Sequence, residues 1–326
     1  MKMIRRLILI FCLLFVSVIL AQDNTEDTSM TISALLEKAD NLFKARQYDE
    51  SRDIYIQVMD KAKAEGKNEA LTEAYAMIAR CYLITDRREE GLTYINLAKE
   101  AAAPNEPLGW SRYLGVRGRF EWQDKELVKA TATFKMMYKF CSEKKLYERA
   151  IDAAHMVAIT GTPEMQIEWG KKGIAEAEAG HVTDWLGPLW NNLGASYEDQ
   201  KKYPEALNAY QKAREYHYKY GDALNKLIAD WAVGHSYRLN KDYKNARDWL
   251  NPLVKKFEEV KSAEFVGWTN KELAEIAIAK EDYRTALKHM KIAEEKLKTE
   301  KMPEWDPEGY QEIVDQIAQL EQKINK

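Results

Sequence analysis

Small and aromatic side chains recur along the chain at intervals of about forty residues, between stretches with apolar residues at helical spacing. The densest stretch holds Trp190, Leu193, Gly194, Tyr197, Tyr203, Ala206, Tyr210 and Ala213. Leu193, Gly194 and Tyr197 share one face of a predicted first helix. Gly194 lets a second helix approach closely, and Ala206 is expected to meet it there. Tyr210 is expected to fill the space between neighbouring units. The stretch predicts one helical hairpin.

The same arrangement recurs before and after this hairpin. A small residue occupies the position equivalent to Ala206 in six clear units, at residues 51, 91, 130, 206, 246 and 286. The interval from 130 to 206 holds one more, degenerate unit, with Gly170 and Ile174 at the matching points and a shortened turn over 160–163. Seven hairpins are therefore predicted over residues 33–301, and no stretch shows the alternation of a strand.

The order Trp, Leu-Gly, Tyr, Ala, and Phe or Tyr at these separations resembles the tetratricopeptide repeat. The resemblance implies an all-α fold, a right-handed α-solenoid of about seven helix-turn-helix repeats. In such a fold the first helices line a concave groove. Units of about forty residues exceed the ~34 of the family, which implies helices about one turn longer.

A break follows the array at residues 302–307, and residues 308–325 then carry Ile313, Ile317 and Leu320 at helical spacing. The outer face of this segment is polar. Residues 302–326 are therefore predicted to form the break and a C-terminal capping helix that covers the open end of the array.

The first 21 residues have the pattern of an export signal. Lys2, Arg5 and Arg6 precede an apolar run over 7–20, and Ala21 supplies a small residue at its end. The run is shorter than the ~20 residues that span a bilayer comfortably, which favours a cleaved signal peptide over an uncleaved signal anchor. Residues 22–32 are predicted to be a flexible acidic spacer. The protein is expected to be periplasmic or secreted, or anchored to the membrane by this segment.

Charge and residue spacing exclude several classes of function. The chain has 49 basic and 52 acidic residues, and removal of residues 1–21 leaves 46 basic residues and a net charge of −6. This balance argues against a nucleic-acid-binding protein. Cys81 and Cys141 have no disulfide or metal spacing and are expected to be buried free thiols. No phosphate-binding loop, nucleophile elbow or paired-histidine motif occurs, so no enzyme, cofactor or metal site is predicted.

In each first helix, the residue just after the small Ala or Gly, the one three before it and the one four after it form a stripe that is predicted to point into the groove. The groove candidates are Arg80, Arg119, Trp122, Asn192, Trp231, His235 and Arg238. Asn192 resembles the family residue that holds a bound peptide backbone. Arg beside an aromatic residue suits an extended peptide that is acidic or ends in a carboxylate. The alternative for each residue is an ordinary solvated helix face, or a Trp packed against a neighbouring unit.

The predicted function is an exported adaptor or scaffold that binds a protein or peptide in its groove. Two alternatives remain open. One is a structural subunit of a cell-envelope assembly, in outer-membrane biogenesis, secretion or transport, that uses its convex face. The other is an enzyme accessory or a solenoid that binds a small hydrophobic ligand. The oligomeric state and the partner are not predicted.

Overall fold

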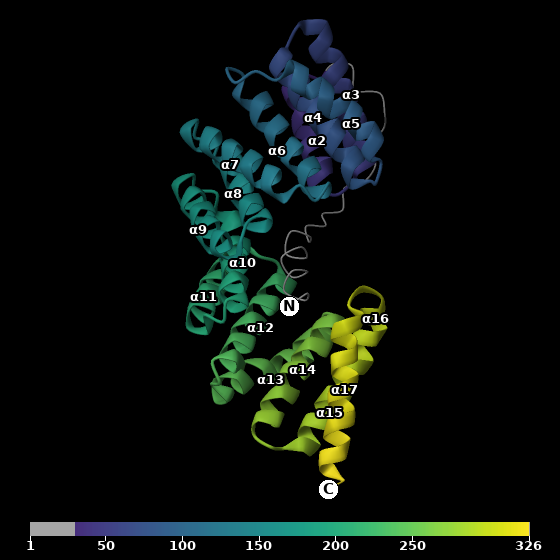
Figure 1. Ribbon diagram of the computed structural model, residues 1–326, viewed down its shortest axis with the longest axis vertical. Coiled ribbons are helices and arrows are strands. Elements are labelled where there is room, and N and C mark those ends of the chain that lie inside the picture. The colour runs from purple at the N-terminus through teal and green to yellow at the C-terminus, as the bar shows by residue number, and fades with distance from the viewer. Residues whose placement is uncertain (1–29, 326) are drawn as a thin grey trace. The chain divides into compact units, whose positions relative to one another are not determined.

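The computed structural model describes residues 30–325. The predicted signal peptide and residues 22–29 of the predicted spacer lie outside these residues. The described chain is helical and contains no strand, which confirms the all-α prediction (Figure 1). It forms two compact units, residues 30–181 and residues 182–325.

The N-terminal unit consists of four consecutive antiparallel hairpins. Their helices are α2 (Ile32–Lys44), α3 (Tyr48–Glu65), α4 (Asn68–Ile84), α5 (Arg88–Ala101), α6 (Pro107–Gln123), α7 (Leu127–Glu143), α8 (Tyr147–Thr160) and α9 (Pro163–Ala179). The fourth hairpin, α8 with α9, is the degenerate unit that the sequence predicts. Only Gly161 and Thr162 join its helices, and the Thr162 side chain caps α9 by accepting a hydrogen bond from Met165 N–H. Ile174 is buried as expected, but Trp169 and Gly173 face the core rather than Gly170.

The C-terminal unit has three hairpins and two additional helices. Its helices are α10 (Leu186–Asp199), α11 (Tyr203–Tyr220), α12 (Ala223–Leu239), α13 (Tyr243–Glu259), α14 (Ala263–Ala279), α15 (Tyr283–Thr299), α16 (Met302–Trp305) and α17 (Pro307–Ile324). Ile313 and Leu320 of α17 are buried in the same core as α15, and Lys291 pairs with Glu321 at 2.7 Å. The prediction of seven hairpins and a C-terminal capping helix is confirmed.

A residue in the left-handed conformation ends the first helix of most hairpins, although none of these residues is glycine. In the C-terminal unit Lys201, Lys241 and Glu281 have φ of 57°, 61° and 60°. The backbone N–H of the next residue donates a hydrogen bond to a carbonyl of the helix that has just ended. Lys202 N–H, for example, donates to Tyr197 O at 2.9 Å. These bonds satisfy carbonyl groups that the helix end leaves free, and they reverse the chain into the second helix.

Close packing within each hairpin depends on a pair of residues sixteen positions apart. A Cβ added to Gly194 would lie 2.8 Å from the Tyr210 ring, and one added to Gly234 would lie 2.8 Å from Leu250. This corrects two details of the sequence analysis. Gly194 faces Tyr210 rather than Ala206, and Tyr210 packs within its own hairpin. The reason is that the aromatic ring, one turn beyond Ala206, occupies the space that the missing side chain leaves.

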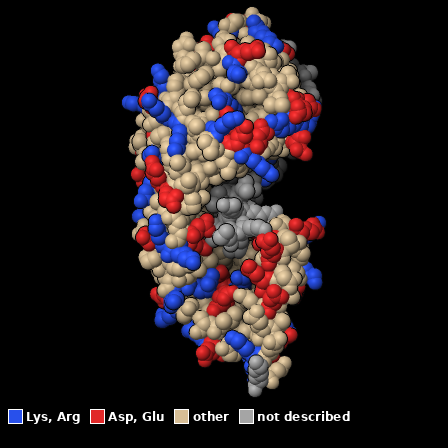
Figure 2. All heavy atoms as spheres, in the orientation of Figure 1, with Lys and Arg blue, Asp and Glu red and all other residues tan. Residues whose placement is uncertain are grey.

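Cys81 and Cys141 are buried free thiols, as predicted. None of the described helices combines the length and apolar character needed to cross a membrane. On the face shown in Figure 2, Lys and Arg are interspersed with Asp and Glu, without a continuous basic field.

Candidate functional site

The first helices of the N-terminal unit bring four arginines together. They are Arg80 on α4, Arg112 and Arg119 on α6, and Arg149 on α8, and all four line one small cavity. Three carboxylates lie among them, from Asp40, Glu73 and Asp152. We call these seven residues the arginine cluster.

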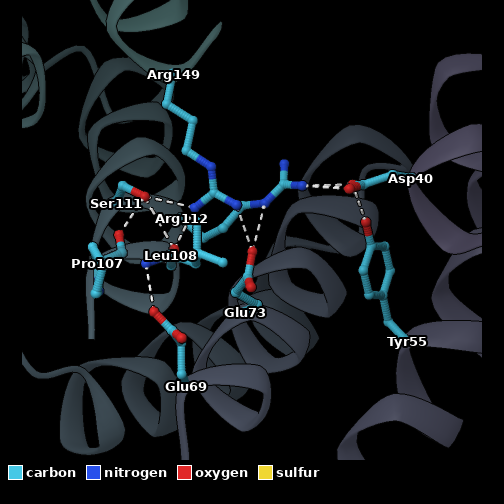
Figure 3. Close-up of polar contacts among 9 residues, drawn as sticks. All are labelled: Asp40, Tyr55, Glu69, Glu73, Pro107, Leu108, Ser111, Arg112 and Arg149. Atoms are coloured by element: carbon cyan, nitrogen blue, oxygen red, sulfur yellow. Dashed lines mark hydrogen bonds and ion pairs between the residues drawn. The ribbon is translucent and has the colours of Figure 1, made fainter. Parts of the chain in front are cut away.

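Arg112 is held on two sides. Its Nη2 donates to both oxygens of Asp40, at 2.7 and 2.6 Å, and its Nε donates to Glu73 at 3.4 Å (Figure 3). The hydroxyl of Tyr55 donates to the same Asp40 carboxylate at 2.6 Å. Burial lowers the pKa of Arg112, but Asp40 and Glu73 outweigh burial and hold this pKa above its ordinary value. The contact joins α2, α3, α4 and α6.

Arg149 extends the network to α8. Its Nη2 donates to Glu73 at 2.5 Å, and its Nη1 donates to the Ser111 hydroxyl at 2.6 Å and to the Leu108 carbonyl. Figure 3 shows Arg112 and Arg149 converging on Glu73 from different helices. Burial and the neighbouring Arg112 lower the pKa of Arg149. Arg149 is therefore a fixed part of the wall of the cavity.

Arg119 has a carboxylate partner of its own. Its Nη2 donates to Asp152 at 2.6 Å and its Nη1 donates to the Gly115 carbonyl at 2.9 Å. Burial raises the pKa of Asp152, but Arg119 and Arg80 outweigh burial and hold it below its ordinary value. Arg119, which is predicted to point into the groove, lines this cavity, and its guanidinium fork is largely occupied.

Arg80 differs from the other three arginines. Its guanidinium lies over the Phe43 ring at 4.7 Å, and its Nε is inaccessible to solvent. This Nε has no hydrogen-bond partner among residues 30–325. Burial lowers the pKa of Arg80 to about 9, and repulsion from Arg119 and Arg112 adds to the effect. Arg80 therefore remains a cation at neutral pH.

The C-terminal unit contains a second polar network, around His235 of α12. The His235 Nε2 lies 3.0 Å from Glu198 of α10, and its Nδ1 lies 3.0 Å from Glu272 of α14. Only Nε2 has hydrogen-bond geometry, toward Glu198, whereas Nδ1 faces Glu272 at ion-pair distance without a hydrogen bond. Burial lowers the pKa of His235, but Glu272 and Glu198 outweigh burial and raise it to about 9. Arg238 donates to both oxygens of Glu272, so two cations match two carboxylates.

The structure thus brings together two of the predicted site residues in one unit and three in the other. Arg80 and Arg119 belong to the arginine cluster, and Trp231 and Arg238 adjoin His235. Trp231 is only 2% exposed, because it stacks on His235 and Phe265 of the neighbouring helix α14 packs edge-on against its ring. It is therefore not the exposed aromatic residue that the helical stripe predicts.

Two predicted residues stand apart from these networks. Trp122, near the end of α6, is 38% exposed and does not line the cavity. Asn192 on α10 is half-buried, and its Oδ1 has no hydrogen-bond partner among the described residues.

The sequence analysis missed Arg112, Glu73, Arg149 and Asp152. Arg112 and Glu73 each lie six residues before the small residue of their helix, Gly118 and Ala79, so the predicted stripe extended by one turn would have found them. Arg149 lies in the degenerate hairpin, which has no clear small residue from which to count. Within residues 30–325, no group of three or more His, Cys, Asp or Glu side chains could hold a metal ion.

Comparison with known proteins identifies one repeat in the sequence. Residues 188–217, which cover most of α10 and α11, match the tetratricopeptide repeat family model. A search of curated proteins finds no match to the sequence. The fold is similar to the apo form of RapI, with a TM-score of 0.68 and 14% identity over 81% of this chain and 76% of that chain.

Two further solved structures are similar in fold. One is a signal transduction ATPase with numerous domains and a tetratricopeptide repeat sensor, from Pyrococcus horikoshii, with a TM-score of 0.67 and 16% identity. The match covers 88% of this chain but 43% of that chain, so this chain spans less than half of that protein. The other is a Rap protein complexed with competence and sporulation factor, with a TM-score of 0.52 and 12% identity over 89% of this chain and 85% of that chain. The chain therefore contains a tetratricopeptide repeat at residues 188–217, with helical hairpins before and after it.

Proposed function

We propose that the protein is an exported, non-catalytic scaffold that binds a protein or peptide partner along the face of its first helices. The observation that carries this proposal is the arginine cluster. Helices α4, α6 and α8 direct four arginines toward one cavity, and Arg80 among them keeps a charge without a carboxylate partner. Stacked helical hairpins commonly bind extended partners on such a face.

The similar structures support a binding role. A Rap protein of the same fold was solved in complex with competence and sporulation factor, so hairpins arranged in this way do accommodate a partner. Residues 1–21 supply the reason to propose export, since their charge and apolar run are typical of a signal peptide. Fractionation of the source cells, followed by N-terminal sequencing, tests export. A mature chain that begins at Gln22 supports it, and a chain that stays in the cytoplasm with Met1 or Lys2 at its start contradicts it.

Partner binding is tested by affinity capture of envelope proteins on residues 22–326, with identification by mass spectrometry. The informative variant is Arg80→Gln, because Arg80 makes no ion pair that the substitution would break. Charge reversal of Arg119 or Arg238 is less useful, since it would place a carboxylate against Asp152 or Glu272. We expect one partner in stoichiometric amount on the wild type and much less on Arg80→Gln. Absence of any partner on the wild type would overturn the proposal.

A second candidate, a structural subunit that docks through its second helices, is favoured by exposed apolar residues on α7. Val128 is 86% exposed and Met136 is 51% exposed. Leu127 beside Val128 is 47% exposed, and Met136 lies about two helical turns further along α7. The variant Val128→Asp with Met136→Asp separates the two functions. Loss of the partner in this variant, with retention in Arg80→Gln, would favour the structural subunit.

A further inference from the structure

The arginine cluster carries four positive and three negative charges. Arg112, Arg119 and Arg149 each have a carboxylate at ion-pair distance, at 2.6, 2.6 and 2.5 Å respectively. Arg80 has none among the described residues, and its favourable contact is with the Phe43 ring at 4.7 Å. The excess positive charge of the cluster therefore resides on Arg80.

An uncompensated guanidinium is unfavourable at this place. The Nε–H of Arg80 is inaccessible to solvent and has no acceptor among residues 30–325. A water molecule would accept from this N–H, but it would leave the repulsion between Arg80 and the cations of Arg119 and Arg112 unchanged. An anion removes both costs, because it accepts the hydrogen bond and also balances the charge.

The cavity beside Arg80 limits the size of this anion. It measures about 30 Å³, and Arg80, Arg119, Arg149 and Asp152 are among the residues that line it. One water molecule occupies roughly 10–15 Å³ of such space. A monatomic anion somewhat larger than a water molecule therefore fits. Phosphate and sulfate, which have four oxygens around a central atom, are too large.

The apolar part of the cavity wall selects among the monatomic anions. Met77, Val116 and Met137 line the cavity, and all three side chains are buried. Thioether and methyl groups do not replace the water molecules that a strongly hydrated anion loses on entry. The wall therefore disfavours fluoride and suits chloride or bromide, which are more weakly hydrated and more polarizable.

Gly115 on α6 leaves space in this cavity. A Cβ added to Gly115 would lie 3.2 Å from the Met137 Sδ and 3.5 Å from the Arg119 Nη1, and both of these residues line the cavity. Glycine inside a helix is less favourable than alanine by about 0.5–1 kcal/mol. The space at Gly115 is therefore kept at a cost in helix stability.

We propose that the cavity beside Arg80 is a binding site for one chloride ion, which accepts a hydrogen bond from the Arg80 Nε–H and balances the fourth positive charge of the cluster. The bound ion lies among α4, α6 and α8 and stabilises the packing of these first helices. The inference goes beyond the proposed function, because the ion binds in the absence of any partner.

The direct test is the ³⁵Cl NMR line width of sodium chloride in the presence of the mature protein of the proposed export route, residues 22–326. Chloride that exchanges with a protein site gives a broader line than free chloride. We expect the protein to broaden the line and sodium bromide to reverse the broadening in a saturable manner. Sodium methanesulfonate, a bulkier anion of the same charge, should leave the line broad.

Thermal unfolding gives a second readout. Chloride at ten times its Kd should raise the Tm by about 3–5 °C, because it binds only the folded protein. Sodium methanesulfonate keeps the ionic strength constant as the chloride concentration changes. A rise in Tm that is equal in the two salts would contradict a specific site.

Two variants test where the ion binds. Arg80→Gln removes the unmatched charge, and Gly115→Ala fills the space but keeps every charge. Each should weaken chloride binding by about tenfold or more while the helical circular dichroism is retained. The matched control is Arg87→Gln. Arg87 also lies over an aromatic ring, that of Tyr82 at 4.6 Å, but its side chain is exposed, so this variant should bind chloride as the wild type does.

The inference is overturned if the wild type broadens the chloride line no more than Arg80→Gln does, or if bromide fails to compete. Equal broadening by the wild type and Gly115→Ala would place the ion outside this cavity and would also overturn it. No partner takes part in these measurements. Failure of the chloride site therefore leaves the proposed function untouched, and failure to capture a partner leaves the chloride site intact.

Discussion

Arg112 donates two hydrogen bonds, of 2.7 and 2.6 Å, to Asp40, which lies 72 positions earlier in the chain. The pair joins the first hairpin to the third, and both side chains are largely shielded from solvent. Replacement of Asp40 by Asn leaves the Arg112 charge with a weaker acceptor. We expect the free energy of unfolding to fall by about 1–3 kcal/mol, measured by urea denaturation.

The matched control for this prediction is Asp53→Asn. Asp53 pairs with Arg52 at 2.8 Å, but it is largely exposed, so its loss should cost less than about 1 kcal/mol. Equal destabilisation by the two substitutions would show that the link between Asp40 and Arg112 adds nothing beyond an ordinary surface pair.

The packing of Gly194 against Tyr210 predicts a specific rescue. Gly194→Ala places a methyl group where the ring lies and should cost about 1–3 kcal/mol. The equivalent positions of the last hairpin hold Ala274 and Met290, both fully buried. The double variant Gly194→Ala with Tyr210→Met should therefore recover part of the loss. A double-mutant cycle measured by thermal or urea unfolding checks this, and strict additivity of the two effects would contradict it.

The left-handed turn at Lys241 predicts a stabilising substitution. The left-handed conformation is unfavourable by about 1 kcal/mol for a residue with a Cβ, but not for glycine. Lys241→Gly should raise the free energy of unfolding by up to about 1 kcal/mol, less the extra flexibility of glycine in the unfolded chain. The control is Lys255→Gly, on the exposed face of α13, which should lower stability by about 1 kcal/mol. A loss of stability in both variants would be evidence against strain at the turn.

His235 predicts that stability declines in mild alkali. Its pKa is about 9 in the folded protein and 6.5 when unperturbed, so the folded state holds the proton more tightly. The stabilisation is complete below about pH 6.5 and is lost as the pH rises through about 9, with a total on the order of 3 kcal/mol. Urea midpoints at about pH 6 and about pH 9 measure the decline.

His235→Gln is the comparison for this pH effect, because it removes the titrating ring and should flatten the decline. His217 does not interfere in this range, since burial lowers its pKa to about 4 and its effect falls in acid. An unchanged slope in His235→Gln would assign the decline to another group.

The sequence predicts the architecture well because small and aromatic residues must recur wherever hairpins pack. Gly194, Gly234 and Ala274 are visible as a series for this reason, and so is α17, whose Ile313 and Leu320 form one apolar stripe. The turns at Lys201 and Lys241 have no such signal, because lysine there occupies a conformation that usually indicates glycine.

The site is only partly visible in the sequence. Helical phase identifies which side of α4 or α12 a residue lies on, so Arg80 and His235 are found. Helical phase does not tell whether a neighbouring helix covers that side. Trp231 lies on the predicted side of α12 but is buried by its neighbours. Partners from distant hairpins, such as Asp40 for Arg112, depend on how successive units are offset, which no single repeat encodes.

The even placement of Lys201, Lys241 and Glu281 has a consequence for how such a chain changes in length. Each of these residues lies at the same position in its hairpin. Deletion or duplication of the segment from one to the next therefore leaves every first helix followed by a second helix in the same register. A deletion of any other size rotates the following helix about its axis and exposes its apolar stripe. We therefore expect insertions and deletions in this part of the chain to preserve the fold only when they add or remove whole hairpins.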